Sequence, residues 1–217
     1  MDEASSAPGG AARGRARGRT GSQPRTKPAE QRRDDLMAAA EALFLEQGIE
    51  ATTVEQITVA AGVAKGTFYL QFKTKEELLD ALRRRFVERY LVELEVAIRE
   101  LPANHHAARL GLWTAVTIGV FLDRDRQRRL LFQGPRDYAA AGGDAAVARL
   151  AELLAAGGRA GAWSLPDARA AAAFLFHGLC GLLDAGARPT GASLADTAAA
   201  IEDAAMVVVE RLVLASD

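Results

Sequence analysis

The sequence predicts an all-α protein with a small three-helix unit near its N-terminus and a larger helical domain behind it. Apolar residues recur at helical spacing along most of the chain after residue 30, and glycines and prolines interrupt this pattern at intervals. From Asn104 onward, no run alternates between apolar and polar residues as a half-buried strand does. At 217 residues, the chain is long enough for one or two domains with a sizeable core.

The boundaries of the first three helices are predicted mainly from residues that begin or end a helix. The first is expected over residues 31–47. The second follows Thr53, which forms a capping box with Gln56, and it ends at Gly62, where a residue without Cβ adopts the left-handed conformation at no steric cost. The third is expected over residues 64–71. Their apolar side chains predict a shared core of Leu36, Ala39, Ala40, Leu43, Phe44, Ile49, Val54, Ile57, Ala61, Val63, Phe68 and Phe72.

A long fourth helix is expected to begin after Thr74, which makes a second capping box with Glu77, and to run to about Glu100. One rigid helix of this length would reach from the first unit deep into the second domain and could transmit a tilt. Its apolar face is predicted to be Leu78, Leu79, Leu82, Phe86, Leu91, Leu94 and Ile98. A basic cluster on or near the other side, most simply interpreted as solvated, is Arg83, Arg84, Arg85 and Arg89.

Further helices are expected over residues 105–123, 126–132, 144–156, 166–185 and 193–215. Pro166 fits a first-turn position, and Ser193 with Asp196 forms another capping box. Loops are expected at residues 133–135, 142–143 and 155–161. The last two helices have faces too apolar for solvent, which favours either a buried hairpin within one chain or an interface between two copies.

Residues 1–29 differ in composition from the rest of the chain. They are rich in Gly, Ala, Ser, Pro and Arg and contain no aromatic residue, which is typical of a disordered tail. The tail holds six basic and two acidic residues, a net charge of +4. It is either inert or an arm that contacts DNA phosphates or the minor groove. The predicted domains are therefore this tail, a unit over residues 30–77 and a helical domain over residues 78–217.

The composition restricts the function. The net charge is −1, so any affinity for nucleic acid must come from a local basic patch. The single cysteine, Cys180, excludes an intrachain disulfide and suits a reducing cytoplasm. We find no metal-ligand spacing, nucleophile–base pair or carboxylate pair, and we expect neither an enzyme nor a cofactor. No secretory segment or membrane span is evident, so we expect a cytoplasmic protein.

Residues 53–72 have the pattern of a helix-turn-helix, whose second helix can lie in the DNA major groove. The first turn of that helix has no acidic residue, and Lys73 and Lys75 flank the start of the next helix, where free N–H groups favour a phosphate. A generic hairpin with solvated side chains is the alternative. The candidate DNA-binding residues are Thr53, Lys65, Gly66, Thr67, Tyr69, Leu70, Gln71, Lys73 and Lys75.

The run from Thr52 to Leu79, TTVEQITVAAGVAKGTFYLQFKTKEELL, resembles the DNA-binding signature of TetR/AcrR-type transcriptional repressors. The resemblance extends back to Leu36, covers about a quarter of the chain and has two departures. Thr58 stands where the family usually has alanine, and Gln71 stands where many members have histidine or tyrosine.

This resemblance implies a dimeric, ligand-responsive, sequence-specific DNA-binding regulator. Most simply, it is a repressor that a small molecule releases from a palindromic operator; activation is also compatible. The last two helices would form the homodimer interface and place two recognition helices about 34–36 Å apart, on two half-sites. A different class, a helical partner-binding or scaffold protein without sequence-specific DNA binding, is the alternative function.

The resemblance also implies a small-molecule pocket in the second domain. Its effector would shift the population between two dimer states, with the long fourth helix as the coupling element. The candidate ligand-binding residues are Trp113, Phe121, Phe132, Tyr138, Phe174 and His177, with Trp163 as a further aromatic residue and Arg136, Asp137 and Asp184 as polar anchors.

Overall fold

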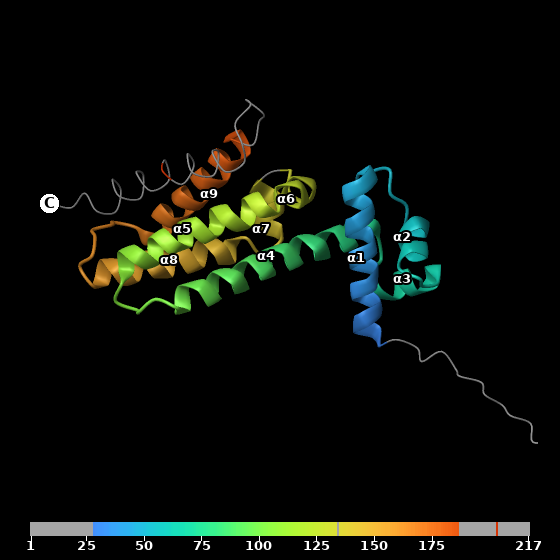
Figure 1. Cartoon of the computed structure of the whole chain (residues 1–217), viewed down its shortest axis with the longest axis horizontal. Helices are drawn as coiled ribbons and strands as arrows, with labels where there is room; N and C mark the ends of the chain where they lie inside the picture. Colours follow the sequence, from blue (N-terminus) through green and yellow to red (C-terminus); the bar gives the residue numbers. More distant parts are fainter. Residues whose placement is uncertain (1–27, 134, 187–202, 204–217) are drawn as a thin grey trace, which may run out of the picture.

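The computed structural model of the chain describes residues 28–133, 135–186 and 203. Within these residues all regular elements are helices, so the all-α prediction is confirmed there. The helices are α1 (Ala29–Gln47), α2 (Val54–Ala60), α3 (Lys65–Gln71), α4 (Lys75–Arg99), α5 (His106–Asp123), α6 (Asp125–Leu131), α7 (Pro135–Ala140), α8 (Asp144–Arg159) and α9 (Ala168–Gly186). Helices α1 to α3 form one end of an elongated molecule, and α4 runs from them alongside the remaining helices (Figure 1).

The N-terminal unit has the core that its sequence predicts. Its most deeply buried apolar side chains are Leu36, Met37, Ala40, Phe44, Ile57, Phe68 and Phe72, and the other predicted core residues are at least partly buried. The capping box at α2 is present: Thr53 Oγ1 accepts a hydrogen bond from the Gln56 N–H at 3.2 Å, and Gln56 Oε1 accepts from the Thr53 N–H at 2.8 Å. Gly62 ends the helix with a φ of 65°, which only glycine adopts without strain.

Helix α4 contributes to both ends of the molecule, because it packs against α1 as well as against α5, α6 and α7. The sequence pattern missed three of its buried residues, Ala81, Val87 and Tyr90. Of the predicted face, Leu79, Leu91 and Ile98 are only partly buried. The Tyr90 hydroxyl shares a 2.9 Å hydrogen bond with Thr117 of α5, so a polar group lies satisfied inside this interface.

Two of the four arginines expected to be solvated hold α4 to its neighbours instead. Arg83 donates from Nε to the carbonyl oxygen of Leu131 at 2.7 Å and lies 3.4 Å from Asp137. Arg85 lies 3.4 Å from Asp34 and 3.8 Å from Glu41, both on α1. The prediction of a solvated basic face holds only for Arg84 and Arg89, which are exposed.

Helix α6 joins the second domain to the N-terminal unit by a separate route. Arg126 donates a hydrogen bond from Nη2 to the carbonyl oxygen of Leu45, and Gln127 donates from Nε2 to the carboxylate of Glu41. Both acceptors lie on α1. The N-terminal unit is therefore fixed to the rest of the chain through α6 as well as through α4.

Several predicted element ends are wrong. Thr74 Oγ1 accepts from the Glu77 N–H, but the Glu77 carboxylate accepts from the N–H of Lys73 and not from that of Thr74, so the second capping box is not reciprocal. Pro166 lies outside α9, because Asp167 Oδ1 accepts from the N–H groups of Arg169 and Ala170 and starts the helix there.

Two helices also differ from the prediction, and two predicted segments are not described. Helix α7 begins at Pro135, which was expected to lie in a loop. Helix α8 continues three residues beyond its predicted end at Ala156. The expected helix over residues 193–215, with its cap at Ser193, and residues 1–27 of the predicted tail lie outside the described part of the chain, apart from residue 203.

Helices α8 and α9 pack together, and Trp163 in the loop between them lies directly against α8. A Cβ on Gly157 would lie 2.0 Å from Trp163 Cζ2, so the indole occupies the space that a side chain would need. Trp163 Nε1 donates to the Leu154 carbonyl oxygen at 2.8 Å. This glycine is therefore required for the close approach of the loop to the helix.

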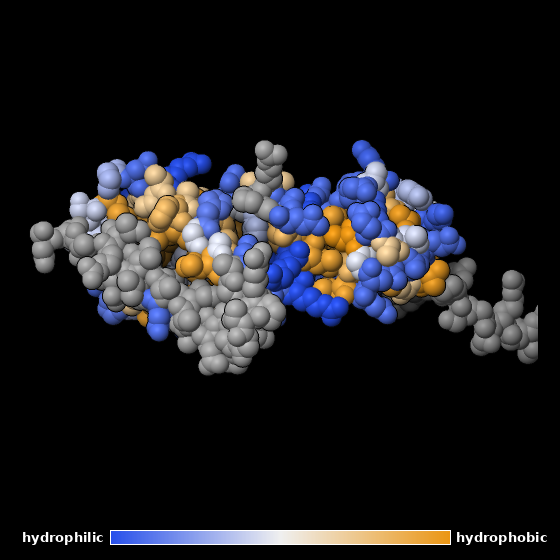
Figure 2. All heavy atoms as spheres, turned by 90° about the horizontal axis from the view of Figure 1, so that it is seen from above, coloured by the Kyte–Doolittle hydropathy of each residue, from blue (hydrophilic) through white to orange (hydrophobic). Residues whose placement is uncertain are grey.

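Hydrophobic residues also reach the surface. On the face shown in Figure 2 they are interspersed with hydrophilic residues, including an area near the middle of the long axis. The large hydrophobic residues that are most exposed in the described chain belong to α2, α3, α4 and α9: Val59, Tyr69, Leu70, Val92, Val96, Phe174 and Leu182. Among the described helices, none combines the length and hydrophobicity that crossing a bilayer requires.

Candidate DNA-binding surface and internal cavity

Helix α3 is a short helix with one anchored face and one free face. Phe68 is fully buried, and Phe72 at the C-cap is 1% exposed, with the two ring centroids 5.8 Å apart. On the opposite side, Tyr69 is 54% and Leu70 is 80% exposed. Two phenylalanines therefore fix the helix to the core while its outer side chains face solvent.

The residues predicted on this helix fall into two groups. Lys65 and Gly66 are exposed beside Tyr69 and Leu70, whereas Thr67 and Gln71 are half-buried. The seven residues of α3 include no acidic side chain, and Lys73 just beyond it is also exposed. A short, acid-free helix that presents lysine, tyrosine and backbone suits contacts with a phosphate backbone and with base edges.

Sequence reasoning missed Arg33 of α1, which holds the C-terminal end of α3. Its guanidinium lies 4.3 Å from the centroid of the Phe72 ring, and Nη1 donates to the carbonyl oxygen of Gln71 at 3.3 Å. The cation stacked on the aromatic ring and the hydrogen bond together fix the angle at which α3 leaves the core. Arginine followed by a distant aromatic residue gives no sequence signal for this contact.

Lys75 does not have the solvent-facing geometry expected of it. Its Nζ donates to the carbonyl oxygens of Ile49 at 2.7 Å and of Thr52 at 3.1 Å, in the connection between α1 and α2. At the N-terminus of α4, Thr74 Oγ1 accepts from the Glu77 N–H at 3.1 Å, and just before the helix Glu77 Oε2 accepts from the Lys73 N–H at 2.6 Å. The pKa of Glu76 lies below its usual value because a backbone N–H and the Thr74 side chain hydrogen-bond to its carboxylate.

The first departure from the TetR/AcrR pattern has a simple structural explanation. Thr58 is 3% exposed, and its hydroxyl donates to the carbonyl oxygen of Glu55 at 2.9 Å. Its polar group is therefore satisfied within α2, and threonine fits where alanine is usual.

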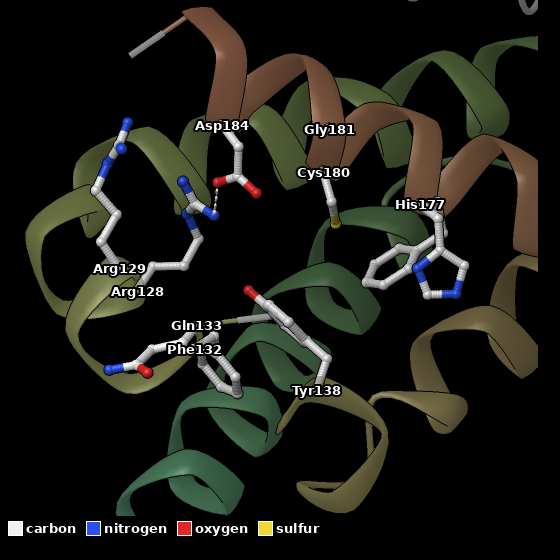
Figure 3. Close-up of a pocket in the computed structure, with 10 residues that line it drawn as sticks. Arg128, Arg129, Phe132, Gln133, Tyr138, His177, Cys180, Gly181 and Asp184 are labelled. Carbon is white, nitrogen blue, oxygen red and sulfur yellow. Dashed lines mark hydrogen bonds and ion pairs between the residues drawn. The ribbon is translucent and has the colours of Figure 1, made fainter. Parts of the chain in front are cut away.

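The second domain contains a cavity of about 450 Å³ between α6, α7 and α9. Figure 3 shows the side chains of Tyr138 and Cys180 directed into the same space as the ion pair of Arg128 and Asp184. The lining residues are Arg128, Arg129, Phe132, Gln133, Tyr138, Phe176, His177, Cys180, Gly181 and Asp184.

Three of the six predicted ligand-binding residues line this cavity: Phe132, Tyr138 and His177. Asp184, predicted as a polar anchor, lines it too. The rings of Phe132 and Tyr138 are stacked, with centroids 3.9 Å apart and planes 17° apart. The volume, the aromatic side chains and the convergent polar groups are those of a small-molecule site.

The other predicted residues lie elsewhere. Trp113 and Phe121 are buried in the core, where Phe121 packs beside Tyr138 with ring centroids 5.9 Å apart. Phe174 is 66% exposed on α9 beside a separate apolar depression. Asp137 pairs with Arg83 and accepts a hydrogen bond from the Gln133 N–H at 2.9 Å. The side chain of Arg136 lies outside the described residues, and Trp163 packs against α8.

Arg128 is the principal residue of the cavity that sequence reasoning missed. Its residue is 2% exposed, and its guanidinium lies 2.6 Å from Asp184 and 3.0 Å from Asp125. Burial lowers the pKa of Arg128, but the hydrogen bonds to these two carboxylates outweigh it and leave the pKa raised. The spacing of Asp125 and Arg128 signals an ion pair within one helical turn, but nothing in the sequence signals burial.

Cys180 also lines the cavity, and burial raises the pKa of its thiol to about 12. The thiol is therefore protonated at neutral pH and acts as a small apolar group there. Among the described residues, including those of the cavity, no group of three or more His, Cys, Asp or Glu side chains is arranged to hold a metal ion.

Comparison with known proteins supports the resemblance. Residues 36–82, from the middle of α1 to the first turns of α4, match the family model described as bacterial regulatory proteins, tetR family. Over 57 residues the chain is 44% identical to the HTH-type transcriptional repressor KstR2 of Mycobacterium tuberculosis (strain CDC 1551 / Oshkosh). This segment covers 26% of this chain and 28% of that repressor. The chain thus spans between 17% and 50% of the length of these curated relatives.

Solved structures share the fold over most of the chain. A TetR-family regulator from Mesorhizobium loti MAFF303099 has a TM-score of 0.68 at 21% identity, covering 85% of this chain and 98% of its own. SmeT, described as the repressor of a Stenotrophomonas maltophilia multidrug efflux pump, has a TM-score of 0.63 at 26% identity, covering 81% and 89%. A complex of SmeT with triclosan gives 0.62 at 25% identity, covering 82% and 90%.

These relatives are named transcriptional regulators rather than enzymes, in agreement with the prediction. Residues 36–82 thus match the tetR family of bacterial regulatory proteins, and the two-part helical fold is shared with solved TetR-family regulators.

Proposed function

We propose that this protein is a sequence-specific DNA-binding transcriptional regulator, most simply a repressor, that a small molecule in the cavity releases from its operator. The observation that carries this proposal is the free face of α3. Lys65, Tyr69 and Leu70 project from a helix that has no acidic residue and that two buried phenylalanines fix in place. A helix that served only as a scaffold would have no need of this arrangement.

DNA contact by this face is supported by its chemistry. Lys65 and Lys73 supply charge for phosphates, and Tyr69 supplies a hydroxyl within reach of the backbone or a base. Gly66 permits the DNA to approach the backbone of α3 closely. Thr67 and Gln71 are half-buried at the edges of the exposed face of α3. To read a base, their side chains must extend into the major groove of the DNA.

A homodimer is supported by the outer face of α9. Phe174 and Leu182 are exposed apolar residues on this face, and Gly178 and Gly181 between them are exposed as well. Small residues between large apolar ones allow two helices to approach closely, so a second copy of α9 is a fitting partner. Phe174 therefore takes the interface role rather than the ligand-binding role that its sequence context suggested.

Coupling from the cavity to the DNA is supported by three consecutive residues of α6. Arg128 lines the cavity, while Arg126 and Gln127 bond to α1 of the N-terminal unit. A ligand that moved Arg128 would therefore pull on α1 through a single helical turn. This is a shorter connection than the length of α4, which the sequence suggested as the coupling element. The ligand lowers the affinity for the operator because it binds the DNA-free state of the protein more tightly than the DNA-bound state. Each tenfold loss of operator affinity requires about 1.4 kcal/mol of coupling free energy.

The proposal is tested by selecting duplexes from a random pool with the purified protein. The expected result is an enriched sequence made of two related half-sites, about one helical turn apart or a multiple of it. Leu70→Ala and Tyr69→Ala are expected to reduce retention of the selected duplex.

A matched control is Val92→Ala, which truncates a similarly exposed apolar residue on α4. It is expected to leave DNA binding unchanged. A pool that remains random after selection at low salt would end the proposal and leave the helical partner-binding protein as the remaining alternative.

A further inference from the structure

Two polar groups of the cavity have no hydrogen-bond partner among the described residues. Neither the hydroxyl of Tyr138 nor Nε of Arg128 forms a hydrogen bond in the described structure, although both atoms are buried. The two residues are 8% and 2% exposed, and both line the cavity. Since buried polar groups in native proteins nearly always have a partner, these two are placed to receive one from a molecule in the cavity.

Both groups offer a proton. An arginine Nε–H can only donate. Burial raises the pKa of Tyr138 above its usual value, so its hydroxyl keeps its proton at any physiological pH. Figure 3 shows this hydroxyl directed toward the space below Arg128 and Asp184. The complementary group on a ligand is therefore a hydrogen-bond acceptor.

Among the described residues, the two arginines at the cavity are balanced by neighbouring carboxylates. Arg128 is paired with Asp125 and Asp184, and Arg129 lies 2.7 Å from Asp125. Two guanidinium groups thus face two carboxylates. A charged ligand would bring an additional charge into this partly buried site without a counter-ion, which is costly.

The rest of the lining is largely aromatic. Phe132 and Tyr138 form a stacked pair, and the ring centroid of Phe176 lies 6.2 Å from that of Tyr138 in an edge-on arrangement. At about 450 Å³, the cavity has room for a ligand of two or three rings.

We infer that the effector of this protein is a neutral, mainly apolar ring compound with an accepting oxygen, such as a ketone, held between the Tyr138 hydroxyl and the Arg128 Nε–H. This inference rests on the proposed function in taking the cavity as the effector site. It goes beyond that function in naming the chemical class and the two groups that recognise it.

The test measures binding to the full chain without DNA, by equilibrium dialysis, of three probes of similar shape. Benzophenone carries an accepting carbonyl, diphenylmethane has no polar group, and diphenylacetate carries a negative charge. The wild-type protein is expected to bind benzophenone most tightly. Tyr138→Phe, which keeps the ring stack, is expected to weaken benzophenone binding about tenfold and to leave diphenylmethane binding unchanged.

Tyr90→Phe is the control, since Tyr90 is a buried tyrosine whose hydroxyl bonds to Thr117 outside the cavity lining. It is expected to change neither affinity. Tightest binding of diphenylacetate, an unchanged benzophenone affinity in Tyr138→Phe, or no binding of benzophenone up to its solubility would each overturn the inference. Because no DNA is present, these results are independent of the duplex selection, which alone decides whether the protein is a DNA-binding regulator.

Discussion

Lys75 Nζ lies 2.7 Å from the carbonyl oxygen of Ile49 and donates a hydrogen bond to it across 26 residues of sequence. A second hydrogen bond, to Thr52, completes the contact. The first residue of α4 thus fastens the connection between α1 and α2, on which the position of the helix-turn-helix depends. This lysine stabilises the fold of the N-terminal unit, a role that its predicted position beside DNA did not suggest.

Lys75→Met should lower the free energy of unfolding by about 1–3 kcal/mol, because it removes two hydrogen bonds from a charged donor and leaves two carbonyl groups without it. Urea unfolding followed by circular dichroism measures the change. Lys65→Met is the matched variant, since Lys65 is exposed and has no such contact among the hydrogen bonds of the described residues.

Lys65→Met should leave unfolding unchanged and reduce the slope of log K against log salt for DNA binding by about 0.9, the value for one phosphate contact. If Lys75→Met instead lowered the salt slope at unchanged stability, its role would be the phosphate contact that the sequence suggested.

Replacing Thr67 or Gln71 by alanine should change the preference among operator sequences by about 1–3 kcal/mol at the base that each reads. Competition between the selected duplex and its single-base variants measures this preference. An equal loss for all duplexes from Gln71→Ala would place that side chain on the DNA backbone.

Gly157→Ala should destabilise the protein by about 2 kcal/mol or more, because the new Cβ would lie 2.0 Å from the Trp163 ring and force the indole out of its place. The fluorescence of Trp163 reports the displacement, and urea unfolding reports the loss. At neighbouring Gly158 the nearest atoms are 4.0 Å away, so Gly158→Ala should be neutral or stabilise by up to about 1 kcal/mol. Equal effects of the two substitutions would contradict the packing described.

The double variant Arg126→Ala and Gln127→Ala should increase hydrogen exchange in the C-terminal half of α1, because α6 loses its hydrogen bonds to Leu45 and Glu41. Mass spectrometry of peptides from α1 measures the rates. Arg149→Ala removes an ion pair on the surface of α8 and should leave α1 unchanged. Unchanged exchange in the double variant would show that α4 alone carries the coupling.

The thiol of Cys180 should react with a disulfide reagent at pH 8 about a thousand times more slowly in the native protein than in denaturant. Burial raises its pKa to about 12, well above the usual value of a thiol, and only the thiolate reacts. The stability that this shift contributes is present below about pH 9 and is lost as the pH rises toward 12. The absence of other cysteines makes the rate directly assignable.

Local signals accounted for most of the helices. The capping box at Thr53, the left-handed Gly62 and the helical spacing of apolar residues each act over a few residues, so the sequence records them directly. Helix α7 was missed because a Gly-Pro pair indicates a loop, although proline also fits the first turn of a helix.

Contacts between distant segments were not predictable in the same way. Arg83, Arg85, Arg128 and Lys75 have the sequence environment of solvated residues, and only the packing of other helices gives them partners. Phe174, predicted as a ligand-binding residue, is exposed beside a separate depression. Helix α9 is apolar on nearly every side, so its sequence does not tell which aromatic residues face the cavity and which face outward.

Helix α4 belongs to both parts of the molecule, since its 25 residues extend about 37 Å and pack at one end on α1 and further along on α5. A chimera that joins this N-terminal unit to the second domain of another protein cannot be joined at a linker, because in the described chain α4 runs through both parts without one. The two sequences must be joined within the continuous helix α4. One residue gained or lost there would rotate the second domain by about 100° relative to the N-terminal unit.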